Sequence, residues 1–349
     1  MQVENTSDHE AWDRFVRASD RSNHYHLSGW RTVLERSYGN RTVYLAGSVD
    51  GEIRGILPLA FVRGFHLTPH LASLPYLSWS GLCTDDDDIA RALVREAGQH
   101  GRQGGAKYVE IHGTQEVRIP GGQADGHQLV TNSDKVAMVL PLQRDPEALW
   151  TGFKAKVRNQ VKKATKSGLS VEMGGAEHLD AFYDCYSENM RDLGSPVHSR
   201  AFFRSLLGEF PDDIRLFIAR KDARPAGGAL LLTFKDTAEV PWASSRREFF
   251  KYCPNNLLYW EMIRYTCEQG LARFDFGRSS EGTGTYRFKK QWGSEPTPLY
   301  WQYYLPQGAT PPDPSHAGLA SRLLVGMWKK LPLGVANAIG PRIRGHISA

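Results

Sequence analysis

The chain has 349 residues, of which 41% are apolar and 23% charged, and its net charge is +5. This composition is typical of a globular protein, and no apolar run approaches the roughly 20 residues that a membrane-spanning helix needs. The length allows two domains, each large enough to bury its own core.

The ends and the cysteines predict a cytoplasmic protein without a structural metal. Residues 1–10 are polar and acidic, and they lack the basic start and the apolar centre of an export signal. The four cysteines are scattered along the chain and suit buried, reduced thiols better than a disulfide framework or a zinc site: Cys83, Cys185, Cys253 and Cys267.

Landmarks of the first half recur in the same order in the second half. The segment 26–30 corresponds to 198–202, the strand pair 43–62 to 214–234, and the segment 105–111 to 271–276. Self-similarity at so long a period predicts two copies of one domain rather than a solenoid of short repeats. Two copies would have a cleft between them, and ligand sites favour such interfaces.

The elements of the first copy follow one another as two helices, a strand hairpin, a strand, a helix and a strand. Their predicted ranges are 8–18, 28–37, 43–62, 76–82, 88–100 and 107–112. Such alternation predicts a mixed α/β sheet with helices on its faces. Asp85 to Asp88 could suggest a metal site, but carboxylates are favoured at a helix start, so we expect a cap.

A basic segment separates the two copies. No acidic residue occurs from Ala148 to Val171, and a helix-like stretch ending at Gly168 carries six cations: Lys154, Lys156, Arg158, Lys162, Lys163 and Lys166. Fixed cations of this kind attract polyanions, so the segment could hold the phosphates of an RNA end or of a nucleotide-linked substrate. A solvated linker helix would have the same composition.

The second copy repeats the element order over 176–190, 199–209, 215–234, 238–245, 256–269 and 273–276, and it carries more reactive residues. Asn255 or Asn256 is expected to cap a helix whose free amides can hold an anion. This copy also carries cationic residues, which could neutralise a phosphate or a developing oxyanion. Aromatic residues alternate with them and could line an acceptor groove or belong to the core. These candidate residues are Trp242, Asp275, Arg278, Tyr286, Arg287, Lys289 and Trp292. The first copy has no such group after Glu110, so the reaction is assigned to the second copy.

The tail from Ser315 to Ala349 contains no acidic residue and carries Arg322, Lys329, Lys330, Arg342 and Arg344. Its apolar residues recur at three- and four-residue steps and form one helical face: Leu319, Leu323, Leu324, Met327, Trp328 and Leu331. Such a helix suits the surface of an anionic membrane, and it equally suits docking on the protein's own core.

Segments 274–278, 286–289 and 157–164 resemble the Fem-related transferases. Segments 195–200, 253–260 and 291–293 resemble more narrowly the branch encoded with PEP-CTERM exopolysaccharide and protein-sorting systems, and the likeness extends from Trp12 to Tyr304. It implies two tandem GNAT-type acyltransferase domains. Fem proteins transfer an amino acid from aminoacyl-tRNA to an amine of a peptidoglycan precursor, and their Phe-Lys pair corresponds to Phe288 and Lys289.

The donor is open between aminoacyl-tRNA and acyl-coenzyme A, neither of them a tightly bound cofactor. Single-domain acetyltransferases hold coenzyme A on a glycine-containing loop, where this chain has residues 246–251 without glycine. The chain also lacks the long helical arm of some Fem proteins. The resemblance thus supports a family more strongly than a particular donor.

We therefore predict GNAT-like domains at 1–145 and 171–305, a basic linker helix at 146–170, and a proline-containing linker with an amphipathic tail at 306–349. Lys289 would stabilise an oxyanion or phosphate, Arg278 and Arg287 would anchor substrate, and Asp275 would orient or deprotonate the amine, or else only anchor Arg278.

The predicted function is amide formation by aminoacyl or acyl transfer to a cell-envelope or exopolysaccharide precursor, in the cytoplasm or at the inner face of the plasma membrane. Two other functions fit the sequence: a non-catalytic scaffold recruited to that membrane, and a nucleic-acid-binding protein that uses residues 154–166.

Overall fold

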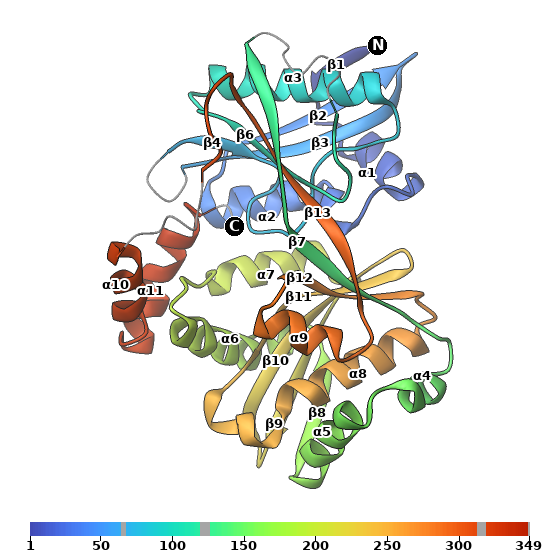
Figure 1. Cartoon of the computed structure of the whole chain (residues 1–349), viewed down its shortest axis with the longest axis vertical. Helices are drawn as coiled ribbons and strands as arrows, with labels where there is room; N and C mark the ends of the chain where they lie inside the picture. The colour runs from blue at the N-terminus through green and yellow to red at the C-terminus, as the bar shows by residue number, and fades with distance from the viewer. Residues whose placement is uncertain (64–67, 119–125, 313–318, 348–349) are drawn as a thin grey trace. The chain divides into compact units, whose positions relative to one another are not determined.

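The computed structural model describes residues 1–63, 68–118, 126–312 and 319–347, without the side chains of 319–322. The chain divides into two compact units (Figure 1). The first unit contains residues 1–135, 298–316 and 342–349, and the second contains 136–297 and 317–341. Within the described ranges, no helix is long and apolar enough to cross a membrane.

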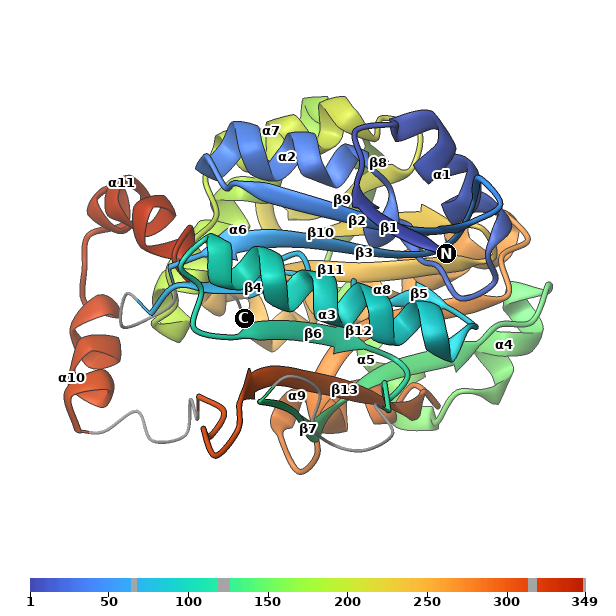
Figure 2. The same cartoon turned by 90° about the horizontal axis from the view of Figure 1, so that it is seen from above.

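The first unit is a mixed sheet with α3 on one face and α1 and α2 on the other (Figures 1 and 2). The strands β1 to β4 pair antiparallel in chain order, β5 pairs with β3, and β4 pairs parallel with β6. Apolar residues of β2 and β3 pack against Ile89 and Leu93 of α3 to form the core. The elements are β1 Gln2–Asn5, α1 His9–Ala18, α2 Gly29–Tyr38, β2 Thr42–Val49, β3 Glu52–Val62, β4 His70–Ala72, β5 Cys83–Thr84, α3 Asp87–Gln103 and β6 Val109–Gly113.

The second unit repeats this plan. Its strands β8, β9, β10 and β11 pair antiparallel, and β12 joins β11 in parallel. The elements are α4 Pro146–Gly152, α5 Ala155–Lys166, β8 Leu169–Gly174, α6 Leu179–Leu193, α7 Arg200–Glu209, β9 Ile214–Lys221, β10 Arg224–Phe234, β11 Thr237–Ser245, α8 Pro254–Glu268, β12 Arg273–Ser280, α9 Gly284–Lys290, α10 Leu319–Trp328 and α11 Leu333–Arg344, the last ending in the first unit.

Two adjacent glycines on β10 allow helices to approach both faces of this second sheet. A Cβ on Gly227 would lie 3.0 Å from Leu258 of α8, and a Cβ on Gly228 would lie 3.1 Å from the Phe182 backbone of α6. Because successive strand residues point to opposite faces, α8 and α6 cover opposite sides. The mixed α/β fold and the repeated order of elements predicted from the sequence are therefore confirmed.

The prediction of a strand at 76–82 is wrong, the predicted cap of α3 is confirmed, and two strands were not predicted. Residues 76–82 form no strand, since Leu74 and Tyr76 have positive φ angles of 32° and 78°, and the short strands β4 and β5 flank the segment instead. Asp86 does cap α3, accepting hydrogen bonds from the Asp88 and Ile89 amides as expected. The strands β7 (His127–Pro141) and β13 (Glu295–Pro306), both unpredicted, each run from one unit into the other.

The basic segment 146–170 is not a separate linker. It forms α4 and α5 inside the second unit, where α5 packs against α8 through an apolar face of Val157, Val161 and Ala164. The second unit accordingly begins at residue 136 rather than at 171. Burial of this apolar stripe explains the difference, because a helix with one apolar face docks on a core instead of bridging two domains.

Candidate functional site

The parallel strands β11 and β12 pair over only three residues. Their ladder ends at the pair Glu239 and Asp275. At the same point β11 bulges, since its pairing with β10 jumps from Trp242 to Glu239 and skips Val240 and Pro241. Proline has no N–H for a ladder and is tolerated in a sheet at bulges, so Pro241 accounts for the bulge. The strands therefore part just beyond a pair of buried carboxyl side chains.

Lys289 reaches this point from α9, whose start is capped by the Thr283 hydroxyl. The lysine is only 9% exposed, and its Nζ donates hydrogen bonds to the carbonyl oxygens of Gly277 (3.0 Å) and Arg278 (2.8 Å). Gly277 has a φ of 78°, and a Cβ there would lie 3.2 Å from the Val240 carbonyl oxygen. Glycine thus lets β12 turn away from β11 and present two carbonyls to one ammonium.

The charges of Asp275 and Lys289 shift each other's pKa. The Asp275 side chain is 1% exposed, and its Oδ1 accepts a hydrogen bond from the Gly277 N–H at 2.7 Å. Burial raises the pKa of this carboxyl to about 6, although the Gly277 amide and the Lys289 ammonium lower it. Burial lowers the pKa of Lys289 to about 8, although Asp275 and Glu239 raise it. Near neutral pH the site therefore holds a buried cation that its carboxylates keep protonated.

The other predicted residues of α9 and β12 lie close in sequence to this pair but differ in exposure. Arg278 and Tyr286 are half-buried, and Arg287 is exposed. Tyr286 and Phe288 pack against the core of the second unit. Of the two predicted cations on α9, the structure thus places Arg287 at the surface and Lys289 inside.

The two tryptophans predicted to line a groove have different surroundings. Trp292 is 1% exposed, and its ring lies 5.2 Å from that of Phe153 and 6.3 Å from that of Phe276. It is a core residue, which supports the second interpretation that the sequence allowed. Trp242 is half-buried and packs edge-on against Phe203 at 5.3 Å.

Neither asparagine caps α8, contrary to the prediction. The N-cap is Cys253, with a φ of 59°, and Pro254 takes the first helical position, which suits a residue without an N–H. Asn255 accepts a hydrogen bond from the Ser245 hydroxyl at 2.6 Å, and Asn256 donates one to Gln160 of α5 at 3.2 Å. These side chains tie the start of α8 to β11 and to α5.

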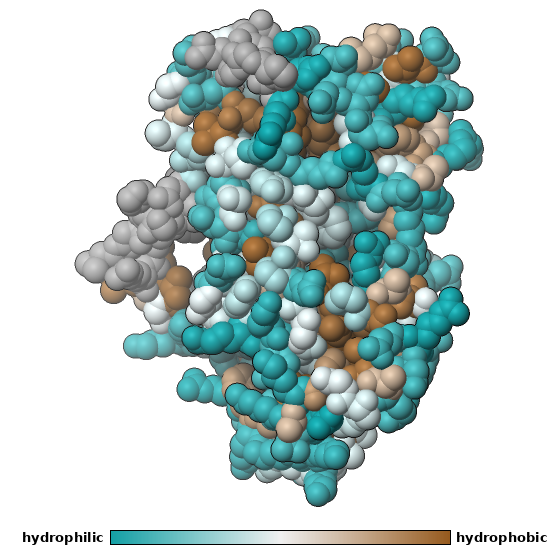
Figure 3. Space-filling view, turned by 45° about the vertical axis from the view of Figure 1, so that its right-hand side comes forward, coloured by the Kyte–Doolittle hydropathy of each residue, from teal (hydrophilic) through white to brown (hydrophobic). Residues whose placement is uncertain are grey.

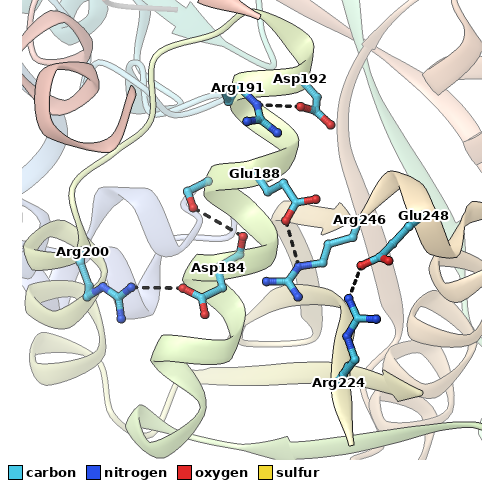
Figure 4. A network of polar contacts seen from close by, with 9 residues as sticks. Asp184, Glu188, Arg191, Asp192, Arg200, Arg224, Arg246 and Glu248 are labelled. Carbon is cyan, nitrogen blue, oxygen red and sulfur yellow. Dashed lines mark hydrogen bonds and ion pairs between the residues drawn. The ribbon is translucent and has the colours of Figure 1, made fainter. Parts of the chain in front are cut away.

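The segment 246–251, which the resemblance aligns with the glycine-containing loop of acetyltransferases, forms most of a 3₁₀ helix, Arg247–Tyr252, with Phe249 buried. Ion pairs fix its surroundings (Figure 4): Arg246 binds Glu188 of α6 at 3.1 Å, and Glu248 binds Arg224 at 2.6 Å. These contacts give the segment a packed, charge-paired structure. A row of free amides for a pyrophosphate would require a glycine-rich turn.

The predicted phosphate-binding cations lie along the outer side of α5. Arg158 is half-buried and donates a hydrogen bond to the Thr151 carbonyl, so it also joins α5 to α4. The lysines are exposed, opposite the buried apolar stripe: Lys154, Lys156, Lys162, Lys163 and Lys166. The charged residues that α5 exposes are therefore all cations.

The first unit contains a buried polar cluster that the sequence reasoning missed. Glu110 pairs with Ala72 at the end of the parallel β4–β6 ladder, the position that Asp275 has in the second unit. His112 Nε2 lies 2.6 Å from one oxygen of Glu110, and His70 Nε2 lies 3.5 Å from the other. Burial lowers the pKa of His70, although Glu110 raises it. In the described part of the chain, no group of three or more histidine, cysteine, aspartate or glutamate residues could hold a metal ion.

The spacing of Glu110 and His112 could have revealed this cluster in the sequence, since residues two apart in a strand share a face. The first unit thus keeps a buried carboxylate at the repeated position, but a histidine rather than a lysine accompanies it.

Comparisons with known proteins agree with this geometry. Residues 151–290 match the family model described as Acetyltransferase (GNAT) domain. The lipid II:glycine glycyltransferase of Staphylococcus saprophyticus is 23% identical over 84% of this chain and 90% of that protein, and the protein of that name from Staphylococcus aureus strain MRSA252 is 21% identical over 81% and 87%.

Two solved structures share the fold. The crystal structure of FemX has a TM-score of 0.69 at 18% identity and covers 88% of this chain and 98% of that one. A tandem GNAT protein from the clavulanic acid biosynthesis pathway has a TM-score of 0.55 at 16% identity and covers 89% of this chain and all of that one. The predicted tandem GNAT architecture is confirmed.

Proposed function

We propose that this protein, which matches the GNAT domain model and is similar to lipid II:glycine glycyltransferases, transfers an aminoacyl group to an amine of a cell-envelope precursor and so forms an amide. The observation that carries this proposal is the buried ammonium of Lys289, held between Gly277 and Arg278 where β11 and β12 part. The PEP-CTERM and exopolysaccharide association stays a prediction.

In the proposed reaction, the acceptor nitrogen attacks the ester carbonyl carbon of the donor. A C–N bond forms, the carbonyl oxygen becomes negative, and the C–O ester bond then breaks as the amine proton passes to the departing hydroxyl. A fixed positive charge beside the carbonyl oxygen accelerates such a step, because it stabilises charge that develops in the transition state. An ammonium has three N–H donors, and two of those of Lys289 bind backbone carbonyls, so the third serves the oxyanion.

Asp275 acts through Lys289 in this scheme and is a positioning residue. Its carboxyl is buried and accepts the Gly277 N–H, which fixes the turn that carries the two carbonyls. Its negative charge also raises the pKa of Lys289 and so favours the ammonium. Arg278, Arg287 and Tyr286 hold the charged and apolar parts of the substrate at the outer side of this turn.

The donor in this proposal is aminoacyl-tRNA rather than acyl-coenzyme A. The segment that the resemblance aligns with the acetyltransferase glycine loop contains no glycine and instead holds the 3₁₀ helix Arg247–Tyr252 and the ion pair between Arg246 and Glu188. The exposed lysines of α5 match the phosphate backbone of RNA, which binds cations with little dependence on sequence. Both features support a polyanionic donor that contacts the second unit over a wide surface.

We propose that the protein acts in the cytoplasm, in peripheral contact with the inner face of the plasma membrane. Aminoacyl-tRNA is made in the cytoplasm, and the relatives named lipid II:glycine glycyltransferase act on a lipid-linked precursor.

The direct test is the substitution Lys289→Met, with Lys290→Met as its matched control because Lys290 is the exposed neighbour on the same helix. Removing an oxyanion donor lowers kcat by roughly 10²–10³-fold, so we expect that loss in Lys289→Met and near wild-type transfer in Lys290→Met. Mass spectrometry of new amides, formed from aminoacyl-tRNA and envelope precursors, measures the rate, and circular dichroism verifies folding. Equal rates for the two folded variants would contradict the proposal.

A further inference from the structure

The helix α10 exposes a stripe of large apolar side chains. Leu323 is 61% exposed, Leu324 58% and Met327 66%, and we refer to these three residues as the α10 stripe. Their spacing of three and four residues places them on one side of the helix. On the face drawn in Figure 3, hydrophilic residues predominate, with smaller apolar areas between them. Contiguous exposed apolar residues usually mark an interaction site.

A different side of α10 is already docked on the second unit. A Cβ on Gly194, at the end of α6, would lie 2.6 Å from Cγ1 of Val325 and 3.1 Å from Cε of Lys329. A Cβ on Gly340 would meet Val197 at 2.9 Å and the Trp328 ring at 3.6 Å. Core docking, one of the two interpretations of the tail, therefore accounts for Val325 and Trp328 but leaves the α10 stripe in water.

The charge around the stripe indicates what covers it. Lys329 and Lys330 follow shortly after it and are exposed, although the stem of Lys329 also passes close to Gly194 on the docked side, and the segment from Ser315 to Ala349 contains no acidic residue. Apolar side chains beside exposed cations match the boundary between lipid headgroups and acyl chains in an anionic bilayer. The side chains of Leu319 and Arg322, which the sequence also assigned to this surface, lie outside the described residues.

We propose that the α10 stripe is a peripheral docking surface for an anionic membrane, with the leucines and the methionine inserted among the lipids and Lys329 and Lys330 bound to lipid phosphates. The inference extends the proposed membrane location to a named surface. Its chemistry does not involve Lys289, so membrane binding and transfer can fail separately.

The test is co-sedimentation of the full chain with vesicles of phosphatidylcholine alone or of phosphatidylcholine with phosphatidylglycerol. We expect binding to the anionic vesicles, weakened by salt, and at least a tenfold loss in the triple variant Leu323→Ser, Leu324→Ser, Met327→Ser. Met173→Ser is the matched control, because Met173 is exposed on β8. The pair Lys329→Gln and Lys330→Gln should reduce the preference for anionic vesicles.

Further measurements check that the variants fold and whether a second copy of the chain, rather than a membrane, covers the α10 stripe. The substituted side chains are exposed, so thermal unfolding of the triple variant should match that of the wild type. Lys289→Met should bind vesicles like the wild type even though its transfer is lost. Unchanged vesicle binding by the triple variant would overturn the proposal. A wild-type dimer that the triple variant converts to monomer, in analytical ultracentrifugation without lipid, would overturn it in favour of a second copy on the stripe.

Discussion

Lys289 must be cationic to stabilise an oxyanion, and its surroundings make that charge conditional. Burial lowers its pKa to about 8, and Asp275 and Glu239 counteract this shift. The ammonium is therefore intact at neutral pH and is lost as the pH rises through about 8. Because Asp275 raises the pKa of the lysine, removing the carboxylate must lower that pKa further and bring the loss to lower pH.

This reasoning predicts the pH dependence of Asp275→Asn. In the wild type, kcat should fall as pH rises through about 8, and in Asp275→Asn the same fall should begin at lower pH. Asp236→Asn is the control, because Asp236 pairs with Arg273 at the start of β12 and does not affect the pKa of Lys289. Single-turnover rates across the pH range measure the shift. An Asp275→Asn profile that falls at the same pH as the wild-type profile would argue against the coupling.

Single residues were predictable from the sequence to very different degrees. The role of Lys289 came from a resemblance, since no spacing rule reveals that a lysine on a short helix turns inward to two carbonyls. Trp292 showed the limit of composition, because a core aromatic and a groove aromatic look alike until burial is known. Glu110 and His112 were missed although their spacing was visible, because the sequence does not show that both side chains are buried or that the distant His70 joins them.

At the scale of elements, the turn in β12 at Gly277 is the feature that creates the site. Its φ of 78° is unfavourable for any residue with a Cβ, and an added Cβ would also lie 3.2 Å from the Val240 carbonyl oxygen. The two Lys289 acceptors are the carbonyls of this turn and of the next residue. Strain in the turn must therefore affect both stability and the position of the ammonium.

We expect Gly277→Ala to lower the free energy of unfolding by about 1–3 kcal/mol and to reduce transfer. The matched control is Gly284→Ala at the start of α9, where an added Cβ meets nothing within 4 Å and φ is not positive. Its effect should stay within about 0.5 kcal/mol. Urea unfolding and transfer rates measure both variants. If the two alanine variants proved equally stable, the strained turn would not have the role assigned to it.

Element prediction succeeded where local patterns decide and failed where distant pairing does. Amphipathic periodicity and caps predicted α1, α3 and α7 within a residue or a few. The strand β13 was missed because Pro296 and Pro298 disfavour a strand, and because its partner β6 lies almost two hundred residues earlier, with Tyr300 opposite Gly113. Such pairing leaves little trace in a local window.

At the scale of the whole molecule, the duplicated plan has diverged in chemistry more than in topology. Both units end a short parallel ladder on a buried carboxylate, Glu110 in the first and Asp275 in the second. The partner is a histidine in one and a lysine in the other. The second unit carries a cationic outer helix, α5, so attraction of a polyanionic donor should be local even though the net charge of the chain is only +5.

This local attraction predicts the salt dependence of transfer. Raising the salt concentration should raise KM for aminoacyl-tRNA, and the slope of log KM against log salt should decrease by roughly 0.7–0.9 for each phosphate contact removed. The variant Lys156→Gln, Lys162→Gln, Lys163→Gln should show a smaller slope and a higher KM at low salt, with kcat kept because Lys289 is untouched. The measurement is initial transfer rates over a range of donor and salt concentrations.

The matched control removes the same net charge elsewhere, at the exposed lysines Lys107, Lys235 and Lys251. If the donor binds along α5, this control keeps the wild-type slope, because only cations that contact donor phosphates release counterions on binding. An equal change in both triple variants would mean that net charge, not α5, attracts the donor. An unchanged slope in the α5 variant would instead favour a compact donor such as acyl-coenzyme A, whose few phosphates need no extended cationic helix.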